Sequence, residues 1–257
     1  MKISFLNSTR KCITTIIRKG FSQVSDIWWN TLGELKGLYS MNKLRVPFVS
    51  DGIVNNGHKI FDPSQPLKGI SIIDVGCGGG ILTESLARTG ANVTGIDPSM
   101  ELIICAKEHA SLDPSLSKNL NYIQTSVEEF VQTNSKMYDA VVSSEVLEHV
   151  MDQEIFIKCC TDLLRPGGVI FLTTINKTFI SWFWGIIVGE YIFKFVPTGA
   201  HEWNKFISPR DTQGLLKKYN CETKLIQGMV YNPMKNEWNW SSWTSIFYAI
   251  QAIKKVD

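Results

Sequence analysis

The feature that most constrains this chain is a short apolar run that passes directly into a glycine-rich loop. Residues 71–75 have the composition of a buried strand, the next five residues read Gly-Cys-Gly-Gly-Gly, and residues 81–88 have the composition of a helix. Glycines let the backbone turn sharply and approach a ligand closely, and the N–H groups of a following helix N-terminus face the same point. Strand, loop and helix in this order predict a nucleotide-type cofactor site at one edge of a sheet.

Alternating strands and helices continue from this loop toward the C-terminus. We expect further strands at residues 92–96, 121–125, 139–143 and 169–174 and near 222–230 and 243–253, with helices at 81–88 and 100–110. Alternation of this kind requires parallel pairing through crossover helices. The predicted fold class is therefore α/β, with a doubly wound, mostly parallel seven-stranded sheet. One domain is expected over residues 26–257, with an insert at about 176–210 that departs from the alternation.

The spacing within the loop discriminates between cofactors. Asp97 ends the second strand twenty-one residues after Gly76, where an acid can accept hydrogen bonds from ribose hydroxyls. The loop is G-x-G-x-G rather than the dinucleotide fingerprint G-x-G-x-x-G, and Ile81 stands where that fingerprint requires a small residue. Asp74 would repel a pyrophosphate but suits the cationic amino-acid end of S-adenosylmethionine. The loop therefore favours S-adenosylmethionine over NAD, with a tight turn that binds nothing as the remaining alternative.

Segments outside the loop narrow the assignment. The loop, together with Thr-Gly-Ile-Asp at residues 94–97, resembles the class I methyltransferases. Other segments resemble the O-methyltransferases of ubiquinone biosynthesis over residues 26–253: Trp-Trp at 28–29, Asn-Lys-Leu-Arg at 42–45, Glu-Val-Leu-Glu-His-Val at 145–150 and Val-Pro-Thr-Gly at 196–199. This resemblance implies methyl transfer from S-adenosylmethionine to a ring hydroxyl of polyprenyl-dihydroxybenzoate and of demethylubiquinol. The alternatives are a methyltransferase for another hydrophobic phenol and a non-catalytic scaffold of a membrane-bound complex.

The resemblance also implies which residues contact the cofactor: Arg45, Gly76, Asp97 and Ser144. The guanidinium of Arg45 is suited to a two-pronged contact with the cofactor carboxylate. Bacterial relatives have a Met where this chain has Ser144. A backbone contact with the adenine would survive that change, whereas a side-chain packing role would not.

The acidic run after the fourth strand carries the candidate catalytic residues. On a helix, Glu145, Glu148 and His149 would share one face at the carboxyl edge of the sheet, where ligands bind. Two carboxylates and an imidazole could hold Mg²⁺, and the resemblance implies Mg²⁺ dependence. The alternative is that no metal binds, that the Glu residues only favour a helix start, and that His149 is the base. His58 and His109 have no chemical neighbours in the sequence and are expected at the surface.

The charge total of +2 combines two unlike parts. Residues 1–25 contain five basic residues, many Ser and Thr and no acid, which is the composition of a mitochondrial transit peptide, with a basic tail as the alternative. The remainder then carries a charge of about −3. Such a balance argues against a nucleic-acid partner.

The insert contains a run of twelve uncharged residues at 178–189 that is rich in Trp and Phe. This run is shorter than the roughly 20 residues that span a bilayer. It predicts either a buried helix or a helix lying in the membrane interface. The resemblance implies the second, with the protein peripheral on the matrix side of the inner mitochondrial membrane and joined to a multi-enzyme coenzyme Q biosynthesis complex. His201 is expected to line the acceptor pocket.

Overall fold

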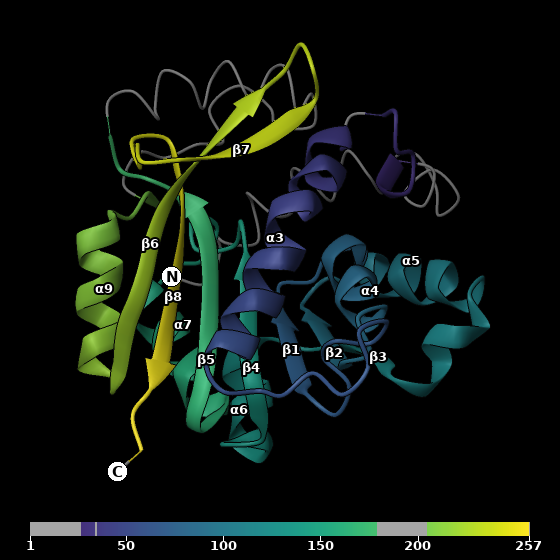
Figure 1. Ribbon diagram of the computed structural model, residues 1–257, viewed down its shortest axis with the longest axis horizontal. Coiled ribbons are helices and arrows are strands. Elements are labelled where there is room, and N and C mark those ends of the chain that lie inside the picture. The colour runs from purple at the N-terminus through teal and green to yellow at the C-terminus, as the bar shows by residue number, and fades with distance from the viewer. Residues whose placement is uncertain (1–26, 34, 179–204, 257) are drawn as a thin grey trace.

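An eight-stranded sheet forms the centre of this computed structural model, which describes residues 27–33, 35–178 and 205–256 (Figure 1). In chain order, the elements of the described residues are α3 (Lys36–Asn55), β1 (Ser71–Val75), α4 (Ile81–Ala87), β2 (Asn92–Asp97), α5 (Met100–Ser111), the 3₁₀-helix η1 (Pro114–Lys118), β3 (Leu120–Gln124), α6 (Val127–Asn134), β4 (Tyr138–Ser144), α7 (Gln153–Leu163), β5 (Leu164–Ile175), α9 (Pro209–Lys218), β6 (Cys221–Asn232), β7 (Glu237–Ser241) and β8 (Phe247–Lys254).

The strand order places the end of β1 beside the end of β4. The order is β3-β2-β1-β4-β5-β8-β6-β7. β1 to β5 pair in parallel, and β8, β6 and β7 are added through antiparallel pairing. The chain winds outward from β1 to β3 and then returns to place β4 on the other side of β1. At such a reversal the carboxyl ends of the two strands border a crevice that binds ligands.

Helices cover both faces of the sheet because neighbouring strand residues point to opposite sides. Ile72 of β1 belongs to the core that includes α3 and Leu86 of α4. The next residue, Ile73, belongs to the core on the other face, with Ile157 of α7 and Leu216 of α9. The expected doubly wound α/β architecture is confirmed.

The structure contains two elements that the sequence did not lead us to expect, β7 and α3. β7 is an eighth strand that pairs with β6 at the sheet edge. Its Glu-Trp-Asn-Trp-Ser sequence alternates polar and apolar residues, which is the signal that could have identified it. The second is α3, which lies against the sheet. Nε1 of Trp238 in β7 donates to the carbonyl oxygen of Gly37 in α3 at 2.9 Å.

Two predicted segments lie outside the described residues. They are the transit peptide at residues 1–25 and most of the insert, including His201. In the part of the chain that the structure describes, no helix combines the length and the apolar composition needed to cross a bilayer.

α3 packs as closely on the sheet as its backbone allows. A Cβ added to Gly52 would lie 2.4 Å from Cε1 of Phe171 in β5 and 3.1 Å from Cδ of Gln251 in β8. The Gln251 amide also donates to the carbonyl oxygen of Gly52. Since α3 supplies Arg45 to the site described below, this contact sets the distance between that residue and the sheet.

Gly52→Ala is expected to destabilise the fold by about 1–3 kcal/mol, because overpacking at Phe171 outweighs the higher helix propensity of Ala. The matched control is Gly214→Ala in the exposed part of α9, where an added Cβ meets nothing within 4 Å. That variant should gain about 0.5–1 kcal/mol. Urea denaturation measures the free energy of unfolding of both variants. Equal stability of the two would show that close packing at Gly52 does not matter.

Candidate active site

The glycine loop after β1 has a backbone that side chains would not permit. Gly76, Gly78 and Gly80 have φ angles of +78°, +53° and +92°, a region that residues with a Cβ rarely adopt. A Cβ on Gly76 would lie only 2.5 Å from Cγ2 of Val146. The loop after β1 therefore packs directly on the segment that follows β4.

Asp97 lies where the sequence predicts an acid, at the end of β2, and it is almost fully buried. Its two carboxylate oxygens accept the backbone N–H groups of Gly78 and Ser99 at 3.0 and 2.8 Å. Burial raises its pKa, although both hydrogen bonds favour the ionised form. Asp97 thus fixes the middle of the glycine loop and keeps a buried negative charge beside it.

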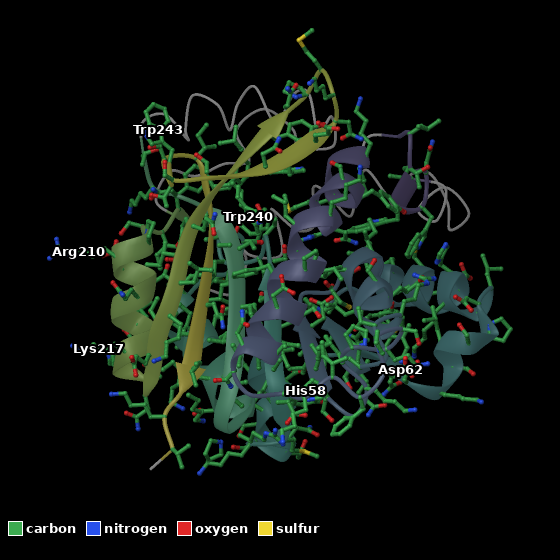
Figure 2. The ribbon with its side chains drawn as sticks, in the orientation of Figure 1. His58, Asp62, Arg210, Lys217, Trp240 and Trp243 are labelled. Carbon is green, nitrogen blue, oxygen red and sulfur yellow. The ribbon has the colours of Figure 1, made fainter. Side chains whose placement is uncertain are left out.

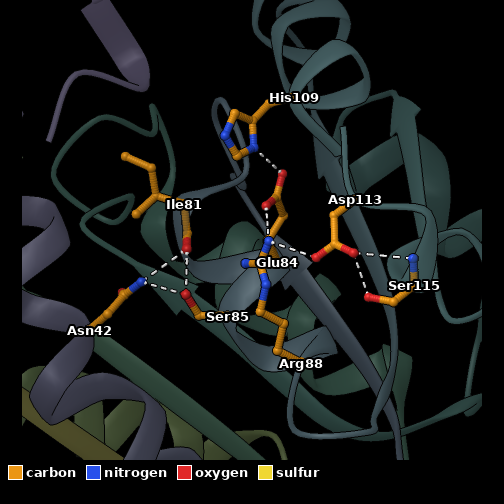
Figure 3. A network of polar contacts seen from close by, with 8 residues as sticks. All are labelled: Asn42, Ile81, Glu84, Ser85, Arg88, His109, Asp113 and Ser115. Carbon is orange, nitrogen blue, oxygen red and sulfur yellow. Dashed lines mark hydrogen bonds and ion pairs between the residues drawn. The ribbon is translucent and has the colours of Figure 1, made fainter. Parts of the chain in front are cut away.

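Polar contacts fix α4, which begins at the end of the loop, on two sides (Figure 3). On one side, Nδ2 of Asn42 in α3 donates to the carbonyl oxygen of Ile81 at 2.9 Å. On the other side, the buried carboxylate of Glu84 bonds Arg88 at 3.0 Å and Nδ1 of His109 in α5 at 2.8 Å. The loop is therefore held between α3 and α5.

The expectation that His109 lacks partners is wrong. In addition to its bond with Glu84, its ring stacks on Trp29 with centroids 3.3 Å apart and an interplanar angle of 2°. His58 also has a partner, since its Nε2 lies 3.1 Å from the carbonyl oxygen of Pro66. The sequence does not reveal these contacts because each partner is remote along the chain or is a backbone atom.

Trp28, which precedes the stacked Trp29, covers the glycine loop. A Cβ on Gly78 would lie 2.6 Å from Cη2 of the Trp28 ring, and a Cβ on Gly79 would lie 2.8 Å from its Cδ2. The Tyr39 hydroxyl donates to the carbonyl oxygen of Trp28 at 2.8 Å. Trp28 therefore packs on the glycine loop, while Trp29 packs on His109 of α5.

Arg45 reaches the site from α3 as a buried cation. Its Nη1 donates to Oγ of Ser144 at 2.9 Å, Nη2 donates to the carbonyl oxygen of Leu38 at 2.9 Å, and Nε and Nη2 both donate to Oδ1 of Asn42. Burial lowers the pKa of Arg45 to about 10, so the side chain stays charged at neutral pH. These bonds use four of the five N–H donors of arginine. The predicted two-pronged contact with a ligand carboxylate would therefore require one of these four hydrogen bonds to be replaced by a bond to the ligand.

Asp74 is a buried carboxylate near this cation. Thr83 donates its hydroxyl to Oδ2 of Asp74 at 2.7 Å. Burial raises the pKa of Asp74 to about 6, and the charge of Arg45 offsets part of that rise. Keeping an acid here costs stability, and such a cost is typical of a binding site for a cationic group.

Glu145, Glu148 and His149 lie on a turn and not on a helix, contrary to the sequence expectation. Glu145 has a φ of +57°, a left-handed conformation that a helix cannot contain. α7 begins only at Gln153, where Asp152 caps its N-terminus. A turn, and not one face of a helix, therefore brings the two carboxylates together.

The carboxyl groups of the half-buried Glu145 and the buried Glu148 are both supported by β5. Thr173 donates to Oε1 of Glu145 at 2.8 Å and Thr174 donates to Oε2 of Glu148 at 2.6 Å. The carboxyl groups of Glu145 and Glu148 are close enough for each to affect the pKa of the other. Burial raises the pKa of both, and the charge of Glu148 adds to the rise at Glu145.

The expected three-ligand metal set is not formed. His149 is exposed, and among residues 27–33, 35–178 and 205–256 no group of three or more His, Cys, Asp or Glu side chains is placed to hold a metal ion. Only the Glu145–Glu148 pair remains as a set of oxygen donors of the kind that Mg²⁺ takes in ones and twos.

Ser144 connects the cationic and acidic parts of the site. It ends β4 directly opposite Thr173 of β5, and its Oγ lies 2.6 Å from Oγ1 of Thr173 while accepting the bond from Arg45. Asn42, Thr173 and Thr174 are not among the residues predicted from the sequence. The Thr pair at the carboxyl end of an otherwise apolar strand is the signal that could have identified two of them.

Comparison with known sequences groups the chain with methyltransferases. Residues 73–172 match the family model of a methyltransferase domain. The chain is 44% identical over 249 residues to the mitochondrial ubiquinone biosynthesis O-methyltransferase of Rattus norvegicus, with 97% of this chain and 72% of that protein covered. The human protein of the same name is 46% identical, with 92% of this chain but only 64% of that protein covered. The ubiquinone biosynthesis O-methyltransferase of Pelagibacter ubique is 36% identical, with 91% and 95% covered.

Solved structures share the fold. Magnesium protoporphyrin IX methyltransferase from Synechocystis with bound SAH has a TM-score of 0.62 at 21% identity, with 94% of this chain and 100% of that chain covered. The same protein with bound SAM has a TM-score of 0.55 at 19% identity, with 82% and 79% covered.

Asp74→Asn is expected to stabilise the fold near neutral pH but not at pH 4. The pKa of Asp74 is about 6 in the folded chain, above the ordinary value of 3.8 for an exposed Asp. The folded chain therefore binds the extra proton between these values and loses stability as the pH rises through them. An amide avoids that loss, which is on the order of 3 kcal/mol above pH 6.

Urea denaturation midpoints at pH 4 and pH 7.5 measure this difference. Asp62→Asn is the control, because Asp62 lies on the surface (Figure 2), where hydrogen bonds from Ser64 lower its pKa; it should show no gain at pH 7.5. A gain for Asp74→Asn of equal size at both pH values would be inconsistent with a raised pKa.

Proposed function

The chain belongs to the ubiquinone biosynthesis O-methyltransferase family and is an S-adenosylmethionine-dependent O-methyltransferase, and we propose that its acceptors are polyprenyl-dihydroxybenzoate and demethylubiquinol. The observation that carries the proposal is the connection of two sites at one sheet edge. The glycine loop and Arg45 on one side are linked through Ser144 and Thr173 to the Glu145–Glu148 pair on the other. A donor and an acceptor bound to these two sides would be held together, which is the main requirement for an in-line methyl transfer.

We assign Arg45, Gly76, Asp97 and Ser144 to the cofactor. The positive φ angle of Gly76 and the buried carboxylate of Asp97 suit the binding of a nucleoside. Arg45 suits the carboxylate at the amino-acid end of the cofactor. Asp74 supplies the negative charge that suits the cationic part of the cofactor. When bound, S-adenosylmethionine supplies an electrophilic methyl group on a sulfonium.

We assign the Glu145–Glu148 pair to the acceptor hydroxyl. A phenol titrates near pH 10 and must lose its proton to react well at neutral pH. Because burial raises the pKa of both carboxyl groups, an ionised member of the pair is a stronger base than an ordinary carboxylate and can accept the proton of a bound phenol. Mg²⁺ held by the two carboxylates would supply a further lowering of the pKa of the acceptor hydroxyl. His149 is assigned as the base that passes the proton to water, since desolvation and the charge of Lys205 lower its pKa to about 4 and the imidazole is therefore neutral near pH 7.

A methylation assay tests this function. With a short-chain prenyl dihydroxybenzoate and a labelled methyl donor, the chain should transfer label to a ring oxygen, and a chelator should abolish the transfer. Activity that is unchanged by the chelator but lost in His149→Ala would remove the metal and leave His149 as the base. Binding of S-adenosylmethionine without transfer to any phenol would contradict the proposed function.

The family includes mitochondrial members in mammals, Dictyostelium and Arabidopsis, and we assign this chain to mitochondria, with residues 1–25 as the transit peptide. We further propose that it is peripheral on the matrix side of the inner membrane, within a coenzyme Q biosynthesis complex. A cavity of about 740 Å³ supports this, because Lys177, Lys205 and Arg210 line it at the two ends of the insert. Arg210 extends outward at the start of α9, and Trp243 is 72% exposed (Figure 2). Basic and aromatic side chains of this kind suit an anionic membrane surface.

Replacing Trp182, Phe183 and Trp184 with Ser is expected to reduce flotation with liposomes of inner-membrane composition, because the uncharged run of the insert provides the apolar contact. Activity on a short-chain soluble acceptor should be retained and serves as the folding control. Unchanged flotation with retained activity would contradict the proposal that the insert binds the membrane.

A further inference from the structure

A chain of hydrogen bonds crosses the site from Arg45 to Glu145. Nη1 of Arg45 lies 2.9 Å from Oγ of Ser144, this oxygen lies 2.6 Å from Oγ1 of Thr173, and that oxygen lies 2.8 Å from Oε1 of Glu145. Ser144 and Thr173 are register partners on adjacent parallel strands, so the sheet itself sets the distance between the two hydroxyls.

The chain has a single direction. Arginine only donates hydrogen bonds, and each hydroxyl has one hydrogen to give. Thr173 gives its hydrogen to Glu145, so Ser144 must donate to Thr173 while it accepts from Arg45. Because linked hydrogen bonds polarise one another in a buried setting, a change at the Arg45 end is felt at Glu145.

Thr173 holds Glu145 at two points. Its hydroxyl binds the carboxyl group, and its carbonyl oxygen accepts the backbone N–H of Glu145 at 2.9 Å. Glu145 has a φ of +57°, which costs a residue with a Cβ on the order of 1–2 kcal/mol and persists only where neighbours enforce it. Thr173 is 5% exposed, so no bulk water competes for these bonds.

We propose that Thr173 is a positioning residue of the methyl transfer, which orients Glu145 toward the acceptor and couples it through Ser144 to the cofactor-binding Arg45. The inference rests on the proposed function, since it assumes that Arg45 serves the cofactor and Glu145 the acceptor. It goes beyond that function by making cofactor binding and acceptor orientation interdependent. The hydroxyl of Ser144, which both accepts from Arg45 and bonds Thr173, is the element that makes this coupling available.

Thr173→Val keeps the shape of the side chain and removes its hydroxyl. We expect kcat with a short-chain prenyl dihydroxybenzoate to fall about 10- to 100-fold, from loss of a bond to a charged group. The dissociation constant for S-adenosylmethionine should rise several-fold in the same variant, although Thr173 is two bonds away from Arg45. Thr173→Ser retains a hydroxyl and should restore both quantities.

Two further variants separate coupling from a structural effect. Thr212→Val removes the hydroxyl of another buried Thr, which bonds Tyr248 at 2.6 Å in the core near α9; it should lower the melting temperature and leave kcat unchanged. Ser144→Ala combined with Thr173→Val should weaken cofactor binding no more than Ser144→Ala alone, because both changes break one chain.

Three results would overturn the proposal: an unchanged kcat in Thr173→Val, no rescue by Thr173→Ser, or additive losses of cofactor affinity in the double variant. Each is judged against an active wild-type protein. Failure of the wild type to bind S-adenosylmethionine or to methylate the acceptor overturns the proposed function itself, and with it the coupling. The two kinds of failure are therefore distinguishable.

Discussion

The site depends on one close contact, between the loop after β1 and the segment after β4. At Gly76 a Cβ would lie 2.5 Å from Val146, so only a glycine lets the two segments meet. The strand order makes this contact possible because it places β4 directly beside β1. The contact in turn brings the cofactor loop against the segment that carries Glu145 and Glu148. Without it, the proposed donor and acceptor sides of the site would not adjoin.

Buried charge is the second constraint on this architecture. Arg45, Asp74, Asp97 and Glu148 are all buried, and burial of charge is costly unless each group is bonded. Backbone N–H groups, hydroxyls and the Asn42 amide supply these bonds. The raised pKa values of the carboxyl groups show that the compensation is incomplete. Such a residual cost is typical of sites that are built to hold a charged ligand.

The fold and the positions of the glycine loop and Asp97 could be predicted from sequence because their signals are local. The glycine loop and Asp97 are defined by spacing along the chain, and the strands by apolar runs. The acceptor side is different. The turn at Glu145 depends on a left-handed residue, the roles of Thr173 and Asn42 depend on strand register and helix placement, and the Trp29–His109 stack joins residues eighty positions apart. These are tertiary contacts, and no window of sequence contains both partners.

We propose that one edge of this sheet binds S-adenosylmethionine through the glycine loop and Asp97. Isothermal titration of the purified chain with S-adenosylhomocysteine, and in parallel with NADH, tests it most directly. We expect stoichiometric binding of S-adenosylhomocysteine that is lost in Asp97→Lys, and no binding of NADH. Binding of NADH, or S-adenosylhomocysteine binding that is unaffected by Asp97→Lys, would contradict it.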